Sequence, residues 1–144
     1  MADKEIIPTG GVYGYTDLQA QGWFLSFPAE ASAAITGPAV VTLSSTLTVA
    51  TAATDGTASL ARGIALESVA SGNIAQVVVA GLVENMPVDG ATAAGSLLKR
   101  SVTTAGRLAA TATPVAGEVL AIALAASSSN TTDVWVVGLG SGLS

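Results

Sequence analysis

Alternation of apolar and hydroxyl side chains in residues 41–49 is the feature that most limits how this chain can fold. Most odd positions there are apolar, and every even position is Ser or Thr. Successive side chains of a strand point to opposite faces, so this pattern is typical of a strand with one buried and one solvated face. We expect a strand over residues 41–49, bent at Ser44-Ser45.

Small side chains extend the argument to the whole chain. Ala, Gly, Ser and Thr supply 74 of the 144 residues, so any core must be thin and closely packed. The Ala residues are interleaved with Thr, Val, Gly and Ser, which form helices poorly, and no Glu–Lys pairs stand at the four-residue spacing of a surface helix. We therefore predict an all-β protein. Further strands are expected at residues 64–66, 74–82, 119–124 and 134–137, with turns at Asp55-Gly56, Ser71-Gly72-Asn73 and Ala105-Gly106.

An internal repeat is visible in these strands. Residues 64–66, a polar turn and residues 77–82 are echoed by residues 122–124, a second polar turn and residues 134–139. The first element recurs after 58 residues and the last after 57. Two copies of one β motif would form a pseudo-symmetric sandwich or barrel. The alternative is a chance likeness between two low-complexity segments.

The first 38 residues differ from the remainder, because Gly and Pro interrupt them every few residues. They nevertheless hold five of the six aromatic side chains, the sixth being Trp135. We predict an N-terminal arm over residues 1–38 and a β domain over residues 39–144 with a flexible Gly/Ser tail. The alternative makes Gly22 to Pro28 the first strand of the domain. The predicted interface residues of the arm are Tyr13, Tyr15, Trp23, Phe24 and Phe27.

Composition excludes several kinds of chemistry. The chain has no Cys and no His, which removes the usual zinc sites, disulfides, catalytic thiols and imidazole bases. Its net charge of −5 gives no electrostatic basis for binding nucleic acid or anionic lipid. The longest uncharged stretch, residues 31–54, is interrupted by Gly37-Pro38 and is a poor membrane span. No targeting signal is expected at the acidic, polar start.

Three short motifs have more ordinary explanations. Ser96 and Lys99 match a Ser-x-x-Lys nucleophile motif, but the partner motifs of such enzymes are missing. Residues 138–142 superficially suggest a phosphate-binding loop, but such a loop must open a helix, and we expect a flexible tail here instead. The triplet at residues 130–132 fits a glycosylation acceptor, and we expect a turn there.

Isolated charges complete the candidate chemistry. Two of the carboxylates Glu67, Glu84, Asp89 and Glu118 could converge as an acid–base pair or a cation site, although solvated strand edges are the ordinary explanation. The basic residues Lys99-Arg100 and Arg107 are expected to form salt bridges. We predict no catalytic residue, no metal site, no cofactor and no enzymatic activity.

A family resemblance is carried by several runs of small and β-branched residues. They are residues 63–68, 77–83, 94–98, 122–124 and 134–137. With them, the chain from about Leu43 to Leu139 resembles the small capsid cement, or decoration, proteins of tailed bacteriophages. The resemblance implies a compact β-barrel or β-tulip-like sandwich that forms homotrimers. It implies a virion protein, made in the host cytoplasm, that binds the major capsid protein on the outer capsid surface and stabilises the shell.

Other function classes stay open at this point. A virion fibre, spike or surface-layer module would have a similar composition. A carbohydrate-binding module would present Trp23 and Tyr15 in a sugar-sized groove, and a small trimeric β enzyme would need converging carboxylates.

Overall fold

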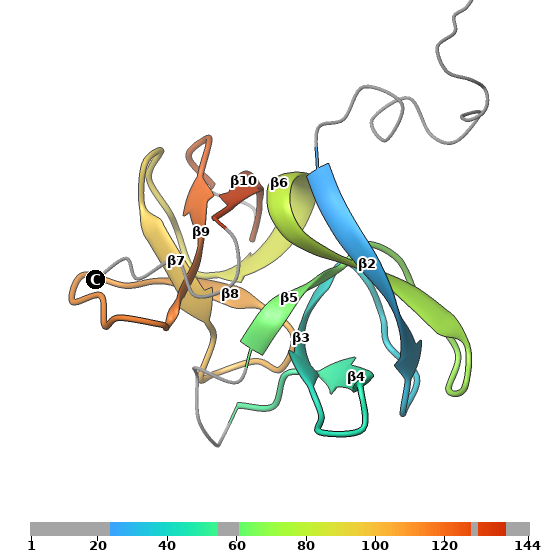
Figure 1. Ribbon diagram of the computed structural model, residues 1–144. Helices are drawn as coiled ribbons and strands as arrows, with labels where there is room; N and C mark the ends of the chain where they lie inside the picture. Colours follow the sequence, from blue (N-terminus) through green and yellow to red (C-terminus); the bar gives the residue numbers. More distant parts are fainter. Residues whose placement is uncertain (1–23, 55–60, 128–129, 138–144) are drawn as a thin grey trace, which may run out of the picture.

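The computed structural model describes residues 24–54, 61–127 and 130–137, and within these ranges the protein is all-β. This confirms the predicted fold class. No helix in the described ranges is long and apolar enough to cross a membrane. The nine strands, shown in Figure 1, are β2 (Phe24–Ala31), β3 (Ala39–Leu43), β4 (Thr48–Thr51), β5 (Ala61–Ala65), β6 (Ile74–Asp89), β7 (Leu97–Arg100), β8 (Leu108–Ala110), β9 (Val119–Ala123) and β10 (Thr131–Val136).

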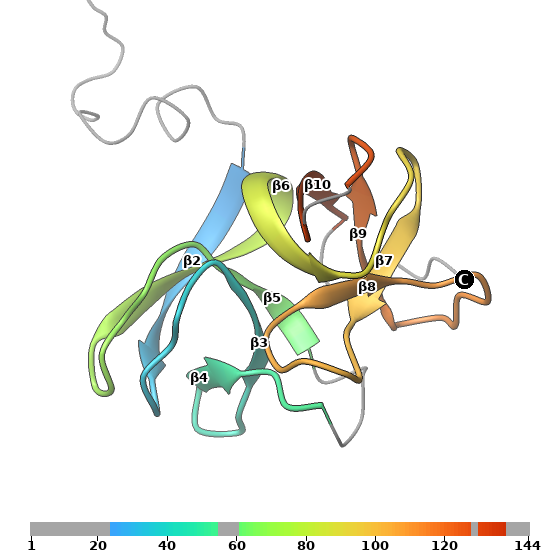
Figure 2. The ribbon, with the colours of Figure 1, turned by 180° about the vertical axis from the view of Figure 1, so that it is seen from behind.

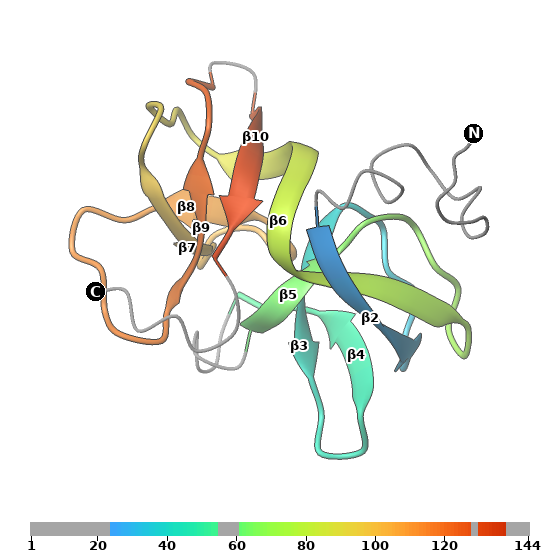
Figure 3. The same ribbon diagram turned by 45° about the horizontal axis from the view of Figure 1, so that its top comes forward.

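One curled sheet contains all nine strands. Its order is β10-β9-β7-β8-β6-β2-β4-β3-β5, and β6 makes two additional pairings, with β10 and with β5. The pairings therefore close into two cycles, one through β2 to β5 and the other through β7 to β10, and both include β6. Figures 1 and 3 show the two groups of strands on either side of β6, and Figure 2 shows them from behind.

Gly81 is the point at which β6 passes from one cycle to the other. It lies opposite Phe24 in β2 and also opposite Val136 in β10. Its φ is 117°, a value that L side chains rarely adopt, and it is buried. Glycine lacks a Cβ atom and reaches this conformation without a steric penalty. The long strand can thus change direction while it stays paired on both sides.

The predicted internal repeat is confirmed by strand pairing. In the first hairpin Ile64 lies opposite Val78, and in the second Ile122 lies opposite Trp135. The correspondence covers five strands per repeat. In chain order, β2, β3, β4, β5 and the start of β6 correspond to the end of β6, β7, β8, β9 and β10. Both repeats contain one parallel pairing, β2 with β4 and β6 with β8. Strand β6 is thus the last strand of the first repeat and the first strand of the second.

Connections between the strands repeat as well. The isolated bridge between Ile35 and Val69 recurs as the bridge between Thr92 and Ser127, 57 and 58 residues later. Where Leu47 has a φ of 64°, the corresponding Gly106 has a φ of 77°. The duplication therefore includes turn conformations and is not limited to the apolar patterns of the strands.

Each cycle encloses its own apolar cluster. The first cycle is filled by small and medium side chains such as Ala31, Val41 and Val77, with Phe27 partly buried against them. The second is filled by larger ones such as Met86, Leu98 and Leu108, and its cluster extends to Val40, Ile64 and Val78 of the first repeat. Val77 and Val78 are both fully buried, one facing each cluster.

Two sequence-based boundaries need correction. Residues 41–49 form a hairpin of β3 and β4 instead of one bent strand, because the Ser44 hydroxyl accepts hydrogen bonds from the amides of Thr46 and Thr48, both at 3.2 Å, and closes a turn. The described part of the predicted arm, residues 24–38, lies within the β domain, because β2 pairs with both β6 and β4. The alternative that placed the first strand at Gly22 to Pro28 matches this arrangement over residues 24–28, which lie in β2. Residues 1–23, the turn at Asp55-Gly56 and residues 138–144 lie outside the described ranges.

Substitution of Gly81 by Ala should destabilise the fold. A side chain at a φ of 117° is strained, so we expect a loss on the order of 1–3 kcal/mol in the free energy of unfolding. Denaturant titration measures this loss. Gly90→Ala is the matched comparison, because its φ of 78° is also positive but lies near the left-handed region that L residues can reach, and its Cβ position is open, so this variant should lose less stability. Equal losses of stability in the two variants would contradict the role of Gly81 as the point where β6 changes direction.

Substitution of Thr92 by Val should stabilise the protein. The Thr92 hydroxyl is buried without a hydrogen-bond partner among the described residues, at the position where the first repeat has Ile35. Replacing it by a methyl group removes a desolvation cost, and we expect a gain of about 1 kcal/mol and a higher melting temperature.

Thr132→Val is the control of opposite sign. The Thr132 hydroxyl is also in a buried residue, but it donates to the Ala125 carbonyl at 2.8 Å. Its loss should lower the melting temperature, and a fall for Thr92→Val as well would contradict the argument.

Candidate interaction surface

The Ser-x-x-Lys motif does not bring its two side chains together. Lys99 lies in strand β7, not in a helix, and its Nζ donates to Glu118 Oε1 at 3.2 Å. The Ser96 hydroxyl accepts a hydrogen bond from the amide of Ala93 at 3.2 Å. Each group thus has a structural role of its own, and the pair lacks the geometry of a nucleophile and its base.

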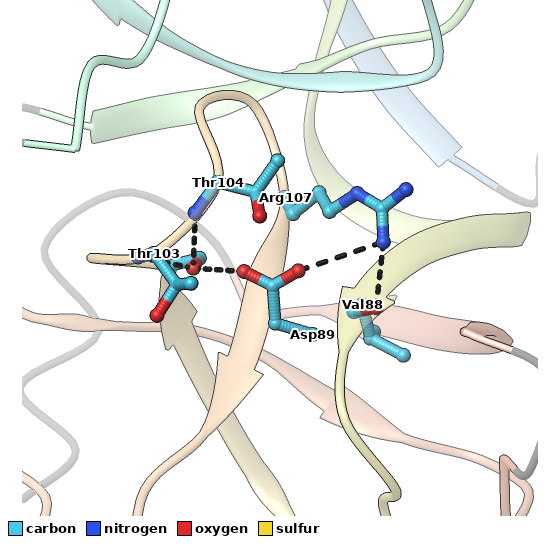
Figure 4. Close-up of polar contacts among 6 residues, drawn as sticks. Val88, Asp89, Thr103, Thr104 and Arg107 are labelled. Atoms are coloured by element: carbon cyan, nitrogen blue, oxygen red, sulfur yellow. Dashed lines mark hydrogen bonds and ion pairs between the residues drawn. The ribbon is translucent and has the colours of Figure 1, made fainter.

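Arg107 and Asp89 form the polar centre near the turn of the second repeat, as Figure 4 shows. Arg107 Nη1 lies 3.5 Å from Asp89 Oδ1 and donates to the Val88 carbonyl at 3.3 Å. The Ser101 hydroxyl donates to the other oxygen of Asp89 and accepts from the amides of Thr103 and Thr104. The predicted salt bridges of Lys99 and Arg107 are therefore present and lie within one chain.

Arg100 has a different role. It is 3% exposed, and its Nη1 donates to the carbonyl of Ala53 in the first repeat. A buried guanidinium thus joins the two repeats, where the sequence suggested only a salt bridge.

Two of the four singled-out carboxylates converge on one groove. Glu67 and Glu84 line a groove of about 270 Å³ whose other walls are apolar, including Phe24, Leu66 and Leu82. Both carboxylates belong to exposed residues. No group of three or more acidic residues within the described ranges could hold a metal ion. The groove thus offers apolar contact with two solvated acids at its rim.

An apolar row crosses four neighbouring strands of the second repeat. Leu82 in β6 lies opposite Trp135 in β10, Trp135 opposite Ile122 in β9, and Ile122 opposite Leu97 in β7. Directly opposed residues of antiparallel strands place their side chains on the same face. Leu124, two residues after Ile122, extends the row. We call these five residues the Trp135 face.

The Trp135 face points away from the cluster inside its cycle. The neighbours of Trp135 along the strand, Val134 and Val136, are 0% and 2% exposed, whereas Trp135 is 42% exposed and Leu124 is 48% exposed. A half-exposed tryptophan surrounded by leucine and isoleucine has the composition of a protein–protein contact. The sequence did not identify this surface, because the apolar run at residues 134–137 does not show which of its side chains face water.

The structure gives two of the five predicted interface residues a role within the domain. Phe24 is partly buried against the cluster of the second cycle, and Phe27 is partly buried against that of the first. Tyr13, Tyr15 and Trp23 lie outside the described ranges, so their role in an interface stays a prediction.

Comparison with solved structures gives a partial likeness of fold. No family model and no curated protein matches the chain. A solved structure, the head fiber gp8.5 N base of bacteriophage phi29, is similar with a TM-score of 0.49 and 15% identity, over 78% of this chain and 93% of that one. At this identity and score we carry no function over from it.

Truncation of Phe27 should lower stability. The Phe27→Ala variant loses a half-buried ring, and we expect about 2 kcal/mol less free energy of unfolding, below the cost for a fully buried phenylalanine. Leu25→Ala, two residues away and 65% exposed, is the control and should change stability little. Equal and small losses for both variants would show that Phe27 does not belong to the core.

Proposed function

We propose that this protein is a structural component of a bacteriophage virion, of the cement or decoration type that binds the major capsid protein on the outer surface of the shell. The observation that carries the proposal is the Trp135 face, an outward apolar row on four paired strands, because it indicates a protein that acts through contacts with other chains, its own copies included. A cement protein acts through the summed area of its contacts, and aromatic side chains supply most of the energy of such contacts.

Polar geometry supports a binding role over a catalytic one. Lys99 and Arg107 are paired with Glu118 and Asp89, and Ser96 has a backbone partner. The resemblance of the chain from about Leu43 to Leu139 to cement proteins points the same way. We include in the proposal that the protein is not an enzyme, needs no cofactor, and binds neither nucleic acid nor membrane.

Partners follow from the same proposal. The major capsid protein is the principal partner, and Tyr13, Tyr15 and Trp23 are proposed to contact it. The second partner is the protein itself, as a homotrimer, which the family resemblance implies.

A virion fibre or spike module is the second candidate. The tandem repeat favours it, because β6 ends one five-strand unit and begins the next, an arrangement that can extend along an axis as repeat proteins do.

Binding to shells tests the proposal. Purified protein is added to expanded shells of its phage that lack it, and binding is measured by co-sedimentation and cryo-electron microscopy. We expect density on the outer surface and greater resistance of the shell to heat. Density confined to a fibre or tail would favour the second candidate, and absence of any association would reject both.

Triple substitution of Tyr13, Tyr15 and Trp23 by Ala should weaken shell binding and leave the melting temperature of the isolated protein unchanged. One aromatic hot spot is worth ~2 kcal/mol, or roughly 30-fold in affinity. Val115→Ala, which truncates a residue that is 53% exposed, is the control. A collapse of the isolated protein's stability, with binding reduced only in proportion, would show that these aromatics belong to the core.

A further inference from the structure

We propose that the Trp135 face docks onto the opposite end of a second copy of this chain, the end of the first repeat that carries Leu43 and Leu47, so that copies associate head to tail. We call that end the Leu47 end. The inference rests on the self-association included in the proposed function and is independent of shell binding.

The first repeat already shows how the corresponding face is used. Val40, Ile64 and Val78 form its row, because Val40 lies opposite Ile64 and Ile64 opposite Val78. All three are 0% exposed and belong to one cluster with residues of the second repeat, such as Leu120 and Val136. This face of the first repeat is therefore an interface within the chain.

Residues of the second repeat close that interface through their backbone and one side chain. The Val40 amide donates to the Gly106 carbonyl at 2.8 Å, and the Gly106 amide donates to the Ala52 carbonyl at 2.9 Å. Arg100 reaches the Ala53 carbonyl next to it. The end of the second repeat that bears Arg100 and Gly106 thus covers the outer row of the first.

The Trp135 face holds the same positions in the second repeat. Val40, Ile64 and Val78 correspond to Leu97, Ile122 and Trp135 through equivalent pairings. Because no third repeat follows within the described residues, the row that the first repeat buries stays half-exposed in the second. A surface that recognises such a row is present on every copy of the chain.

The Leu47 end of the first repeat corresponds to the end of the second repeat that bears Arg100 and Gly106. Ser44 and Ser101 each close a turn, and their amides donate to the carbonyls of Thr48 and Arg107. Leu43 precedes one turn and Arg100 the other, and Leu47 corresponds to Gly106. The contact between the two repeats uses an arginine and a glycine, whereas the Leu47 end has two leucines at the corresponding positions. Leu47 is 71% exposed.

The proposed contact between copies differs in one respect from the contact between the two repeats within one chain. A Cβ atom on Gly106 would lie 2.9 Å from Thr51 Cγ2, so a residue larger than glycine cannot approach the strands so closely. Leu47 instead places its side chain against the partner, and Trp135 and Leu124 supply apolar surface for it. Residues 40–54, which form the Leu47 end, contain no charged side chain. The charge nearest to Trp135 along the chain is Asp133, whose Oδ1 accepts a hydrogen bond from the Asn85 amide at 3.0 Å. The Leu47 end therefore brings no like charge against Asp133.

Two charge-bearing variants test the proposal by sedimentation and light scattering across the micromolar range. Wild-type protein should exceed the 14.0 kDa of one chain, and Trp135→Asp and Leu47→Asp should each weaken self-association at least tenfold. An equimolar mixture of the two variants should form a dimer, because each supplies the face that the other lacks. Val102→Asp is the matched control: Val102 is 64% exposed in the corresponding turn of the second repeat, and this variant should assemble like wild type.

Circular dichroism melting establishes that each variant is folded, and Leu124→Asp replaces Trp135→Asp if the latter is not. Monomeric wild-type protein, normal self-association of Leu47→Asp, or a mixture of folded variants that stays monomeric would each overturn the proposal. Variants that are monomeric but still bind shells would support head-to-tail contact and leave capsid binding intact. Wild-type protein that self-associates through these faces but does not bind shells would contradict the proposed capsid binding and leave the head-to-tail contact supported.

Discussion

Strand β6 is the constraint on which the rest of the structure depends. Its first half closes one cycle of strands and its second half closes the other, and the change of direction occurs at Gly81. Backbone groups buried in a sheet need partners, and Gly81 lies between Phe24 and Val136, so the turn from one cycle to the next leaves the strand paired on both sides. Because glycine tolerates a φ of 117°, one continuous strand joins the two repeats without backbone strain at this point.

Duplication explains why a chain with so few large side chains can build a core. Each cycle is narrow enough to be filled mainly by Ala and Val in the first repeat and by Val, Ala, Leu and one Met in the second. The first repeat then buries its outer row against the second, which adds apolar contact that neither unit could supply alone. The same geometry leaves one outer row without a partner among the described residues, and this row is the Trp135 face.

Much of the fold was predictable from local patterns, and the surface was not. Alternation and apolar runs located most strands, and the recurrence of residues 64–66 and 77–82 revealed the repeat. The hairpin within residues 41–49 was missed because its turn depends on a leucine at positive φ, which no composition rule indicates. The Gly and Pro residues around Phe24 and Phe27 predict an irregular arm, but pairing with β6 holds both residues in strand β2.

The sequence by itself determined that this chain is all-β and poor in reactive side chains, and it indicated an internal repeat, because side-chain period, residue type and recurrence are all read from the sequence alone. Only the tertiary structure decided which repeat covers the other, and therefore that Val78 is buried while the equivalent Trp135 is 42% exposed. Burial depends on what packs from outside a strand, and segments distant in the chain supply that packing. Equivalent sequence patterns can thus form a core in one repeat and an interaction surface in the next.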